Sequence, residues 1–508
     1  MASTDLVWRQ TSAGVWSRSI DEIEKFYATM VVLYEVSGRM FFGMTGHVSL
    51  SIKIPEGTSQ EQAESAVDKA LKKAWLALRY AHPTLAAKVT ENVQTGEWTK
   101  NYRQFENEAD KDAWLEKTLV HVSTGQTGNE WANSDPPAPN VPTMFVLDLP
   151  ADGTSTVRRD LVFRSPHDII DGIGTLMMLN NFITRAAEAY EKGDSFEIPV
   201  FDGSESANLS PSYRLAAQVP PELTEAQKKR IEEITAQKAA VSSDPSVEHL
   251  ALPFNSGPLL PGRHQRIALT FSQDQTKSLI KACKGVGATP THVFHAAAAM
   301  VMRDVQEPPA ETKRVRYINY ILRNERDKCD APYNSALHAA SVYHSVSGQS
   351  LIVDMDLPAA GTKVDLKQRR EEFLSVLENM KDFYHTVKED KEHYILTPTL
   401  WTLGTPTLTP SPRPLPVPPP NAHPSVSISS MGRTDAIVAP ENGAFSTRDP
   451  WVTGEELGNG LGLFLGTSRG ELCLSAAYND AWHTADEVQQ YLDRCKEAVY
   501  WGLSIDAE

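Results

Sequence analysis

Cysteine is scarce in this chain, and no two cysteines stand close together. The sequence of 508 residues has four of them, at Cys283, Cys329, Cys473 and Cys495. None forms a Cys-x-x-Cys pair, so the pattern argues against a structural zinc site and against a disulfide framework. We therefore expect free thiols in a reducing compartment and no bound metal.

Long hydrophobic runs are also missing. The first 21 residues are polar and lack the apolar core of a secretory signal. The stretch Tyr27–Met44 is fairly apolar, but Glu35 and Arg39 interrupt it before it reaches the roughly 18 residues of a membrane span. We expect a cytoplasmic protein that does not insert into a membrane.

Positive charge is outnumbered by negative charge. The chain has 49 Lys and Arg residues against 65 Asp and Glu residues, which gives a formal net charge of −16. Such a surface repels nucleic acid and anionic lipid, although a few local basic groups can still bind an anionic small molecule. We expect small-molecule ligands, no nucleic-acid partner and a monomeric protein.

The length of 508 residues exceeds the roughly 250–300 at which a single hydrophobic core stops growing. Hydrophobic residues make up 41% and charged residues 22%, which is typical of globular proteins. Predicted strands and helices alternate in both halves, which favours an α/β fold of two domains, each a sheet covered by helices. We place the N-terminal domain at residues 1–222, a charged and proline-containing connection at 223–264, and the C-terminal domain at 265–508.

The first half contains clear strand and helix patterns. His47–Ile54 alternates apolar and polar residues, as a half-buried strand does. Thr58 or Ser59 can cap a helix that runs to about Tyr80. Further elements are expected as the strands Val141–Leu149 and Thr156–Phe163 and a helix from Gly172 to about Lys192.

The second half repeats this alternation. The expected elements are the helix Glu225–Ala240, the strand Gln265–Phe271, the helices Gln273–Lys284 and Pro290–Met302, the strand Val315–Leu322, the helix Val364–Tyr384, the strand Ser425–Ser430, the hairpin strands Gly462–Ser468 and Glu471–Tyr478, and the helix Asp486–Tyr500. Between Thr397 and Pro424 stand ten prolines, which exclude a helix or an interior strand and predict an exposed polyproline loop. A cover over the active site is a second interpretation of this loop.

The segment His167–Gly172, with the sequence HDIIDG, lies between a predicted strand and a predicted helix. A histidine at such a bend is held firmly and can still reach a cavity. Its pKa near neutrality suits it to take the proton of an alcohol that attacks a thioester, which makes His167 a candidate general base. The alternative is a histidine that only packs in the core or caps the helix.

Two neighbours of His167 have open roles. Asp171 could orient the imidazole as in a catalytic triad, or it could pair with a basic residue and hold the bend in shape. Gly172 permits a backbone conformation that a side chain would strain. Other motifs are weaker, because His292 and His295 lack a third metal ligand and no Gly-x-Ser-x-Gly elbow surrounds a serine.

These features together resemble the superfamily of chloramphenicol acetyltransferase-like proteins, which includes the plant BAHD acyltransferases and the condensation domains of peptide synthetases. The matching segments are the strand–HxxxDG–helix unit around His167, RYAHPTLAAKV at 79–89, KACKGVGATPTHVFHAAAA at 281–299 and SVSISSMGR at 425–433. They spread over nearly the whole chain. Within the superfamily, the sequence is similar to fungal trichothecene O-acetyltransferases of secondary metabolism.

The resemblance implies two similar domains with His167 at their interface, in a tunnel open at both ends. It also implies that Asp171 points away from the reacting centre and pairs with an arginine. The best match for that arginine is Arg323, with Arg326 as the alternate. A loop that borders the tunnel and could assist the oxyanion is matched by Ser429, Ser430, Met431 and Gly432.

Two departures from the superfamily patterns bear on the subgroup. Pro166 stands where the doubled-histidine form of many condensation domains has its first histidine. The plant motif Asp-Phe-Gly-Trp-Gly is absent, and the segment Asp449–Gly454 stands near its expected place. Both differences disfavour those subgroups, and the second leaves the local structure of that segment open.

The activity that the resemblance implies is that of an acyl-CoA-dependent O-acetyltransferase. It would move acetyl from acetyl-CoA to a hydroxyl of a sesquiterpenoid, the C-15 hydroxyl of a trichothecene mycotoxin intermediate, with no metal and no covalent intermediate. One alternative is a condensation-type enzyme acting on a carrier-bound thioester. Another is a catalytically silent binding homologue, against which the intact His167, Asp171 and Gly172 argue.

Overall fold

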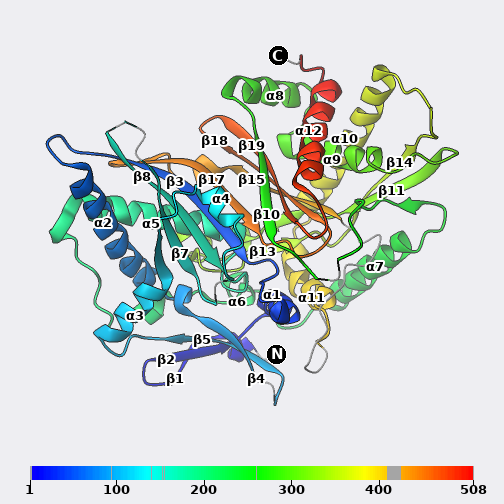
Figure 1. Ribbon diagram of the computed structural model, residues 1–508. Helices are drawn as coiled ribbons and strands as arrows, with labels where there is room; N and C mark the ends of the chain where they lie inside the picture. Colours follow the sequence, from blue (N-terminus) through cyan, green and yellow to red (C-terminus); the bar gives the residue numbers. More distant parts are fainter. Residues whose placement is uncertain are drawn as a thin grey trace.

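The computed structural model describes residues 3–92, 94–138, 140–150, 153, 155–258, 260–408 and 425–506. Figure 1 shows two α/β halves side by side, with mostly blue and cyan elements on the left and mostly green, yellow and red elements on the right. The predicted α/β architecture of mixed sheets covered by helices is confirmed. The domain limits at residues 222 and 264 stay a prediction.

The first half is built on a six-stranded mixed sheet in the order β16-β17-β3-β8-β7-β6. Its strands are β3 (Met44–Lys53), β6 (Leu119–Val122), β7 (Thr143–Asp148), β8 (Thr156–Ser165), β16 (Glu441–Asn442) and β17 (Phe445–Gly454), and its helices are α2 (Gln60–Ala81), α3 (Glu108–Thr118), α4 (Gly128–Ala132) and α5 (Gly172–Lys192). Helices α2 and α5 pack against each other, and α5 also packs against β3 and β17. Ser59 begins α2 with a capping box to Gln62.

Two strands of this sheet come from the far end of the chain. Strand β17 pairs antiparallel with β3, beginning at Phe445 opposite Ile52. A bulge interrupts the pairing between Arg448 and Trp451, and Asp449 within it has a positive φ of 49°. The segment Asp449–Gly454, whose structure the sequence left open, is therefore a bulged strand that ties the second half to the first.

The second half contains a four-stranded sheet in the order β10-β19-β18-β15 and a three-stranded sheet in the order β14-β11-β9. Its strands are β9 (Glu248–His249), β10 (His264–Thr270), β11 (Lys313–Asn319), β14 (Leu351–Leu357), β15 (Val426–Arg433), β18 (Leu461–Ser468) and β19 (Glu471–Asn479), and its helices are α8 (Gln273–Gly285), α9 (Pro290–Asp304), α10 (Leu366–Glu389) and α12 (Ala485–Leu503). The alanine-rich helix α9 is buried on nearly every side, because α10 and α12 both pack against it.

A smaller group of elements lies between and below the two halves (Figure 1). It includes the sheet β1-β2-β5-β4, with β1 (Arg9–Ser12), β2 (Val15–Ser19), β4 (Lys88–Asn92) and β5 (Glu97–Arg103), the two-stranded sheet β12 (Leu322–Asn324) and β13 (His344–Val346), and the helices α1 (Glu22–Tyr34), α6 (Tyr213–Ala216), α7 (Glu225–Ser242) and α11 (His393–Gly404). Helix α1 packs against α11, and α11 against α7. These helices border the cavity described below.

Two expectations about local structure are wrong. The predicted strand Val315–Leu322 is divided, because the chain leaves one sheet after Asn319 and pairs β12 with β13 in another. The proline-rich stretch begins inside a helix, since α11 continues through Pro398 to its end at Gly404. A proline there leaves the carbonyl of Tyr394 without its helical partner, and that oxygen instead accepts a hydrogen bond of 3.3 Å from the Tyr213 hydroxyl. The rest of the stretch, residues 409–424, lies outside the described residues.

Candidate active site

His167 lies in the short bend between β8, which ends at Ser165, and α5, which begins at Gly172. The bend is closed by a hydrogen bond from the N–H of Ile169 to the carbonyl of Pro166 at 3.3 Å. His167 lines a cavity of about 620 Å³. Its Nδ1 is buried against the protein, so Nε2 is the nitrogen that a molecule in the cavity can reach.

Asp171 is the N-cap of α5 and is almost fully buried. One carboxylate oxygen accepts the N–H of Gly174 at 2.7 Å. The other accepts the N–H of Tyr343 at 2.8 Å and Nη1 of Arg326 at 2.8 Å. Burial alone would raise the pKa of Asp171, but the Arg326 guanidinium and these hydrogen bonds hold it below its ordinary value. Both carboxylate oxygens of Asp171 are thus hydrogen-bonded to other parts of the protein.

The predicted partner of Asp171 was Arg323, and that prediction is wrong. The structure pairs Asp171 with the alternate, Arg326, and Nε of Arg323 with Glu325 at 2.8 Å. The cause lies in the turn after β12. Arg323 sits on the strand and donates to the carbonyl of Val387 at 2.6 Å, whereas Arg326 follows in a 3₁₀ turn that brings it back to the start of α5.

Two residues that the sequence did not single out surround His167. The ring of Tyr27, on α1, stacks on the imidazole with 3.7 Å between centroids and 8° between planes. The imidazole of His344, on β13, lies 5.4 Å from that of His167, centroid to centroid. The hydroxyl of Tyr27 and Nε2 of His344 are hydrogen-bonded at 2.9 Å. Both residues line the same cavity as His167.

A buried ionic network holds the backbone of the bend that contains His167. Nζ of Lys100, on β5, donates to the carbonyl of Asp168 at 2.7 Å and pairs with Glu24 of α1. Glu24 also accepts two hydrogen bonds from Arg18 of β2, at 2.6 and 2.7 Å. The charges of Arg18 and Lys100 lower the pKa of Glu24 to about 2 despite its burial. The small N-terminal sheet therefore fixes the backbone beside His167.

Burial and, to a smaller extent, the neighbouring His344 lower the pKa of His167 to about 3, so the imidazole is neutral and can accept a proton. Other desolvated histidines behave in the same way. The six histidines with the largest lowering by burial are His82, His167, His264 and His295, each with a pKa of about 3, and His344 and His393, each with a pKa of about 4. Four carboxyl groups have pKa values raised by burial, namely Asp21 and Glu456 to about 7, Asp168 to about 6, and Glu455.

The predicted loop on β15 reaches the same cavity. Ser429, Ser430 and Met431 line it, and Gly432 follows with a positive φ of 64°. The hydroxyl of Thr291 donates to that of Ser430 at 2.9 Å, which ties the loop to the start of α9. A Cβ added to Gly172 would lie 3.8 Å from Cε of Met431, so this loop flanks the first turn of α5.

A second cavity of about 660 Å³ shares two lining residues, Met431 and Phe464, with the cavity of His167. Three arginines line it, namely Arg266, Arg448 and Arg469. Arg266 is buried, lies over the ring of Trp451 at 4.3 Å, and has an Nε that is buried without a hydrogen-bond partner. Arg448 is exposed and makes no ion pair within the described part of the chain. Two carboxylates, Asp449 and Glu471, also line this cavity.

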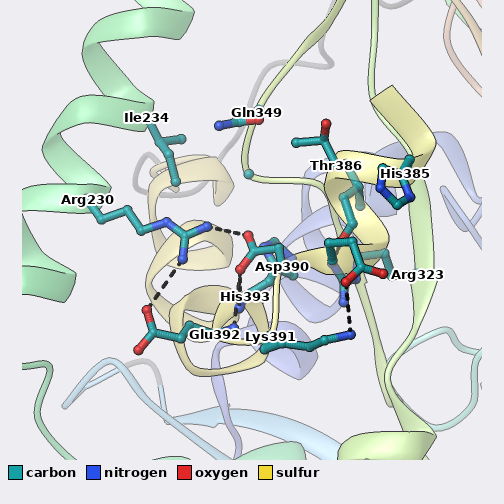
Figure 2. Close-up of a pocket in the computed structure, with 13 residues that line it drawn as sticks. Arg230, Ile234, Arg323, Gln349, His385, Thr386, Asp390, Lys391, Glu392 and His393 are labelled. Carbon is teal, nitrogen blue, oxygen red and sulfur yellow. Dashed lines mark hydrogen bonds and ion pairs between the residues drawn. The ribbon is translucent and has the colours of Figure 1, made fainter. Parts of the chain in front are cut away.

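A third cavity, of about 530 Å³, adjoins the cavity of His167 on another side and shares Ile234 and Arg323 with it. Figure 2 shows that its charged side chains pair with one another, as Arg230 does with Asp390 and Glu392. Their charges are therefore largely satisfied within the wall, and the cavity offers little net charge to a ligand.

Within the described ranges, no group of three or more potential ligands is placed to hold a metal ion. The sequence pair His292 and His295 does not act as one, since the ring nitrogens of His295 are hydrogen-bonded to the hydroxyls of Tyr384 and Tyr317, each at 3.1 Å. Of the helices that the structure describes, none has the length and apolar character that crossing a membrane requires.

Comparison with known proteins places this geometry in context. A family model for 15-O-acetyltransferase Tri3 matches residues 56–328. Similar proteins include the O-acetyltransferase pigM of Monascus ruber, 26% identical over 99% of this chain and 88% of the relative, and the acetyltransferase pigO of the same organism, 23% identical over 98% of both.

Solved structures share the fold. The TRI3 trichothecene 15-O-acetyltransferase from Fusarium sporotrichioides aligns with a TM-score of 0.78 at 16% identity, covering 99% of both chains. The first condensation domain of the calcium-dependent antibiotic synthetase aligns with a TM-score of 0.59 at 12% identity, covering 97% of this chain and 99% of the other. The expected fold of two similar domains is therefore confirmed.

Proposed function

The chain belongs to the 15-O-acetyltransferase Tri3 family, and we propose that it moves acetyl from acetyl-CoA to the C-15 hydroxyl of a trichothecene, with His167 as general base. That it is an O-acetyltransferase follows from the family. The proposal adds to this the acyl donor acetyl-CoA, the acceptor hydroxyl at C-15 and the catalytic base His167. The observation that carries it is the neutral imidazole of His167 on the wall of a cavity large enough for a small organic substrate.

The proposed chemistry needs one base and no covalent intermediate. Nε2 of His167 takes the proton of the alcohol as its oxygen attacks the thioester carbon, and the carbonyl electron pair moves onto oxygen. When the tetrahedral intermediate collapses, the C–S bond breaks and the thiolate takes the proton from His167. The imidazole ends neutral, as it began, and no metal is required.

Asp171 and Gly172 serve this step through structure. Asp171 already accepts three hydrogen bonds, from Gly174, Arg326 and Tyr343, so it does not act as the third member of a catalytic triad. Its charge holds the start of α5 against the segment that contains Tyr343, and thereby fixes the bend that carries His167. Gly172 leaves room for Met431 and Val452 beside the first turn of the helix.

The cavity of His167 and the neighbouring arginine-lined cavity suggest where the substrates bind. We assign the phosphates of acetyl-CoA to the arginine-lined cavity, because guanidinium groups bind phosphate well and Arg448 has no competing ion pair among the described residues. Across the bulge, the stretch of β17 from Arg448 to Val452 pairs with only three residue steps of β3, Ser49 to Gly46, so Arg448 lies about 10 Å along the sheet from Val452, which flanks Gly172. The flexible pantetheine arm can span such a gap.

The acceptor is assigned to the cavity of His167 itself. Its wall between α1 and α11 is apolar, with Phe26, Phe42 and Trp401, and Leu403 stands exposed beside it. A terpenoid skeleton offers mostly hydrocarbon surface, which such a wall binds by excluding water. Acetyl-CoA and the alcohol would thus approach His167 from different sides of the loop at Met431.

The test is transfer of acetyl from free acetyl-CoA to a panel of terpenoid alcohols, including a trichothecene with a free C-15 hydroxyl, with mass detection of products. We expect acetylated trichothecene with the purified protein and a fall of about 10²–10⁴-fold in kcat for His167→Ala. Near-normal turnover by that variant would overturn the role of the histidine. Transfer only from a carrier-bound thioester would favour a condensation-type enzyme instead.

A further inference from the structure

The pair formed by Tyr27 and His344 beside the proposed base has no role in the chemistry above. Both residues line the cavity of His167, and they come from α1 and β13, which are 317 residues apart along the chain. The stack of Tyr27 on His167 sets the plane of that imidazole. The hydrogen bond from Tyr27 reaches over to His344, so the three rings form one packed unit.

The hydrogen bond fixes which nitrogen of His344 carries the proton. Tyr27 is 6% exposed, and within the described chain its hydroxyl has His344 Nε2 as its one hydrogen-bond partner. Burial raises the pKa of Tyr27 well above its ordinary value, so the hydroxyl keeps its proton and must place it in a hydrogen bond. Nε2 therefore accepts, and Nδ1 of His344 carries the ring proton.

The charge state of His344 agrees with a neutral donor. Burial lowers its pKa to about 4, and of the two charged groups that face it, Asp171 favours the protonated form while Arg326 opposes it. At neutral pH the ring thus has one N–H, at Nδ1. Among the residues that the structure describes, none accepts a hydrogen bond from that Nδ1, so it remains for a ligand of the cavity.

We propose that His344, held in its Nδ1–H form by Tyr27, donates a hydrogen bond to the oxygen that becomes negative when the alcohol attacks the thioester. The inference rests on the proposed function and names the group that stabilises its intermediate. The proton of the alcohol goes to Nε2 of His167, the electron pair of the carbonyl goes to oxygen, and the N–H of His344 stays bonded to nitrogen throughout. When the C–S bond breaks, the oxygen returns to a carbonyl and the hydrogen bond weakens.

The arrangement suits the two demands of the reaction. The ring centroids of His167 and His344 are 5.4 Å apart and both residues line one cavity, so a molecule that contacts both rings can meet a base at one and a donor at the other. A donor that is already aligned costs little reorganisation when charge develops. The serines of the loop on β15 are less constrained, and Ser430 is exposed and already bonded to Thr291.

The kinetic test compares His344→Phe, which keeps an aromatic ring without a donor, with His344→Gln, which keeps an N–H. We expect kcat to fall about 10²-fold for the Phe variant, with KM for acetyl-CoA and for the alcohol changed by less than about threefold, and we expect the Gln variant to recover part of the loss. His385→Phe, at an exposed histidine outside this cavity, is the matched control and should keep full activity. A kcat within about threefold of wild type for His344→Phe, or equal losses for Phe and Gln, would overturn the proposal.

A second measurement does not depend on turnover. Two-bond ¹H–¹⁵N correlation of the ¹⁵N-histidine-labelled protein reports which nitrogen of each ring is protonated, and the His344→Gln spectrum assigns the signal. We expect the Nδ1–H form in the wild type and a mixture of both forms in Tyr27→Phe, with kcat lowered in that variant because part of the population has no donor at Nδ1. An Nε2–H signal in the wild type would overturn the inference even if the protein acetylates no alcohol. Acetyl transfer by the wild type together with that signal would leave the proposed function standing.

Discussion

Replacing Arg326 by leucine should destabilise the protein strongly, because it leaves the carboxylate of Asp171 buried without its cation. Asp171 and Arg326 are each 3% exposed, and their ion pair is 2.8 Å long. Removing one partner of a buried pair typically costs about 3–5 kcal/mol. We expect the lower end, about 3 kcal/mol, since the N–H groups of Gly174 and Tyr343 still donate to the carboxylate.

Urea unfolding at 25 °C, followed by tryptophan fluorescence and far-UV circular dichroism, measures this loss. If the unpaired charge is its cause, Asp171→Asn added to Arg326→Leu should restore part of the stability. Arg185→Leu is the control, because its ion pair with Glu188 of the same helix is exposed and contributes about 0.5 kcal/mol or less. A loss for Arg326→Leu as small as that of the control would refute the reasoning.

Two further predictions concern stability. Gly174→Ala should lower the free energy of unfolding by about 1–3 kcal/mol, because its Cβ would lie 2.3 Å from the backbone oxygen of Ala339. For Gly172→Ala the nearest atom would be 3.6 Å from the Cβ, and the loss should be less than about 1 kcal/mol. Melting temperatures of the two variants measure this difference. Between about pH 6 and pH 4 the free energy of unfolding should fall as the pH is lowered. The buried histidines with strongly lowered pKa take up protons only when the chain unfolds, so acid favours unfolding. The four carboxyl groups with raised pKa hold protons in the folded state and oppose this in part. Urea titrations at several pH values test the sign, and stability that rises in acid would contradict it.

Features with a local cause could be predicted from the sequence. The capping box of Ser59 and Gln62 begins α2 within a residue of its predicted start. His167 stands on a bend between a strand and a helix because the residues on each side have the periodicity of those elements. Both signals need only neighbours along the chain.

Features that depend on distant contacts could not be predicted in this way. Tyr27 and His344 meet near His167 only after the two halves pack together, and neither carries a motif. A capping box at Asp21 and Glu24 does mark the start of α1 and could have placed Tyr27 on a helix, though not beside His167. The choice between Arg323 and Arg326 depended on one 3₁₀ turn, which moves a side chain by several ångströms without any sequence pattern of its own.

The strand β17 also shapes how the protein is made on the ribosome. Strand β3 lies between β8 and β17, and β17 is synthesised roughly 260 residues after the end of α5. At about 5–20 residues per second, the nascent first half therefore waits for roughly 13–50 s with β3 as an unpaired edge. Such an edge can pair with another chain. The crossing that joins the two halves in the finished enzyme thus leaves the incomplete polypeptide open to pairing with other chains for that interval.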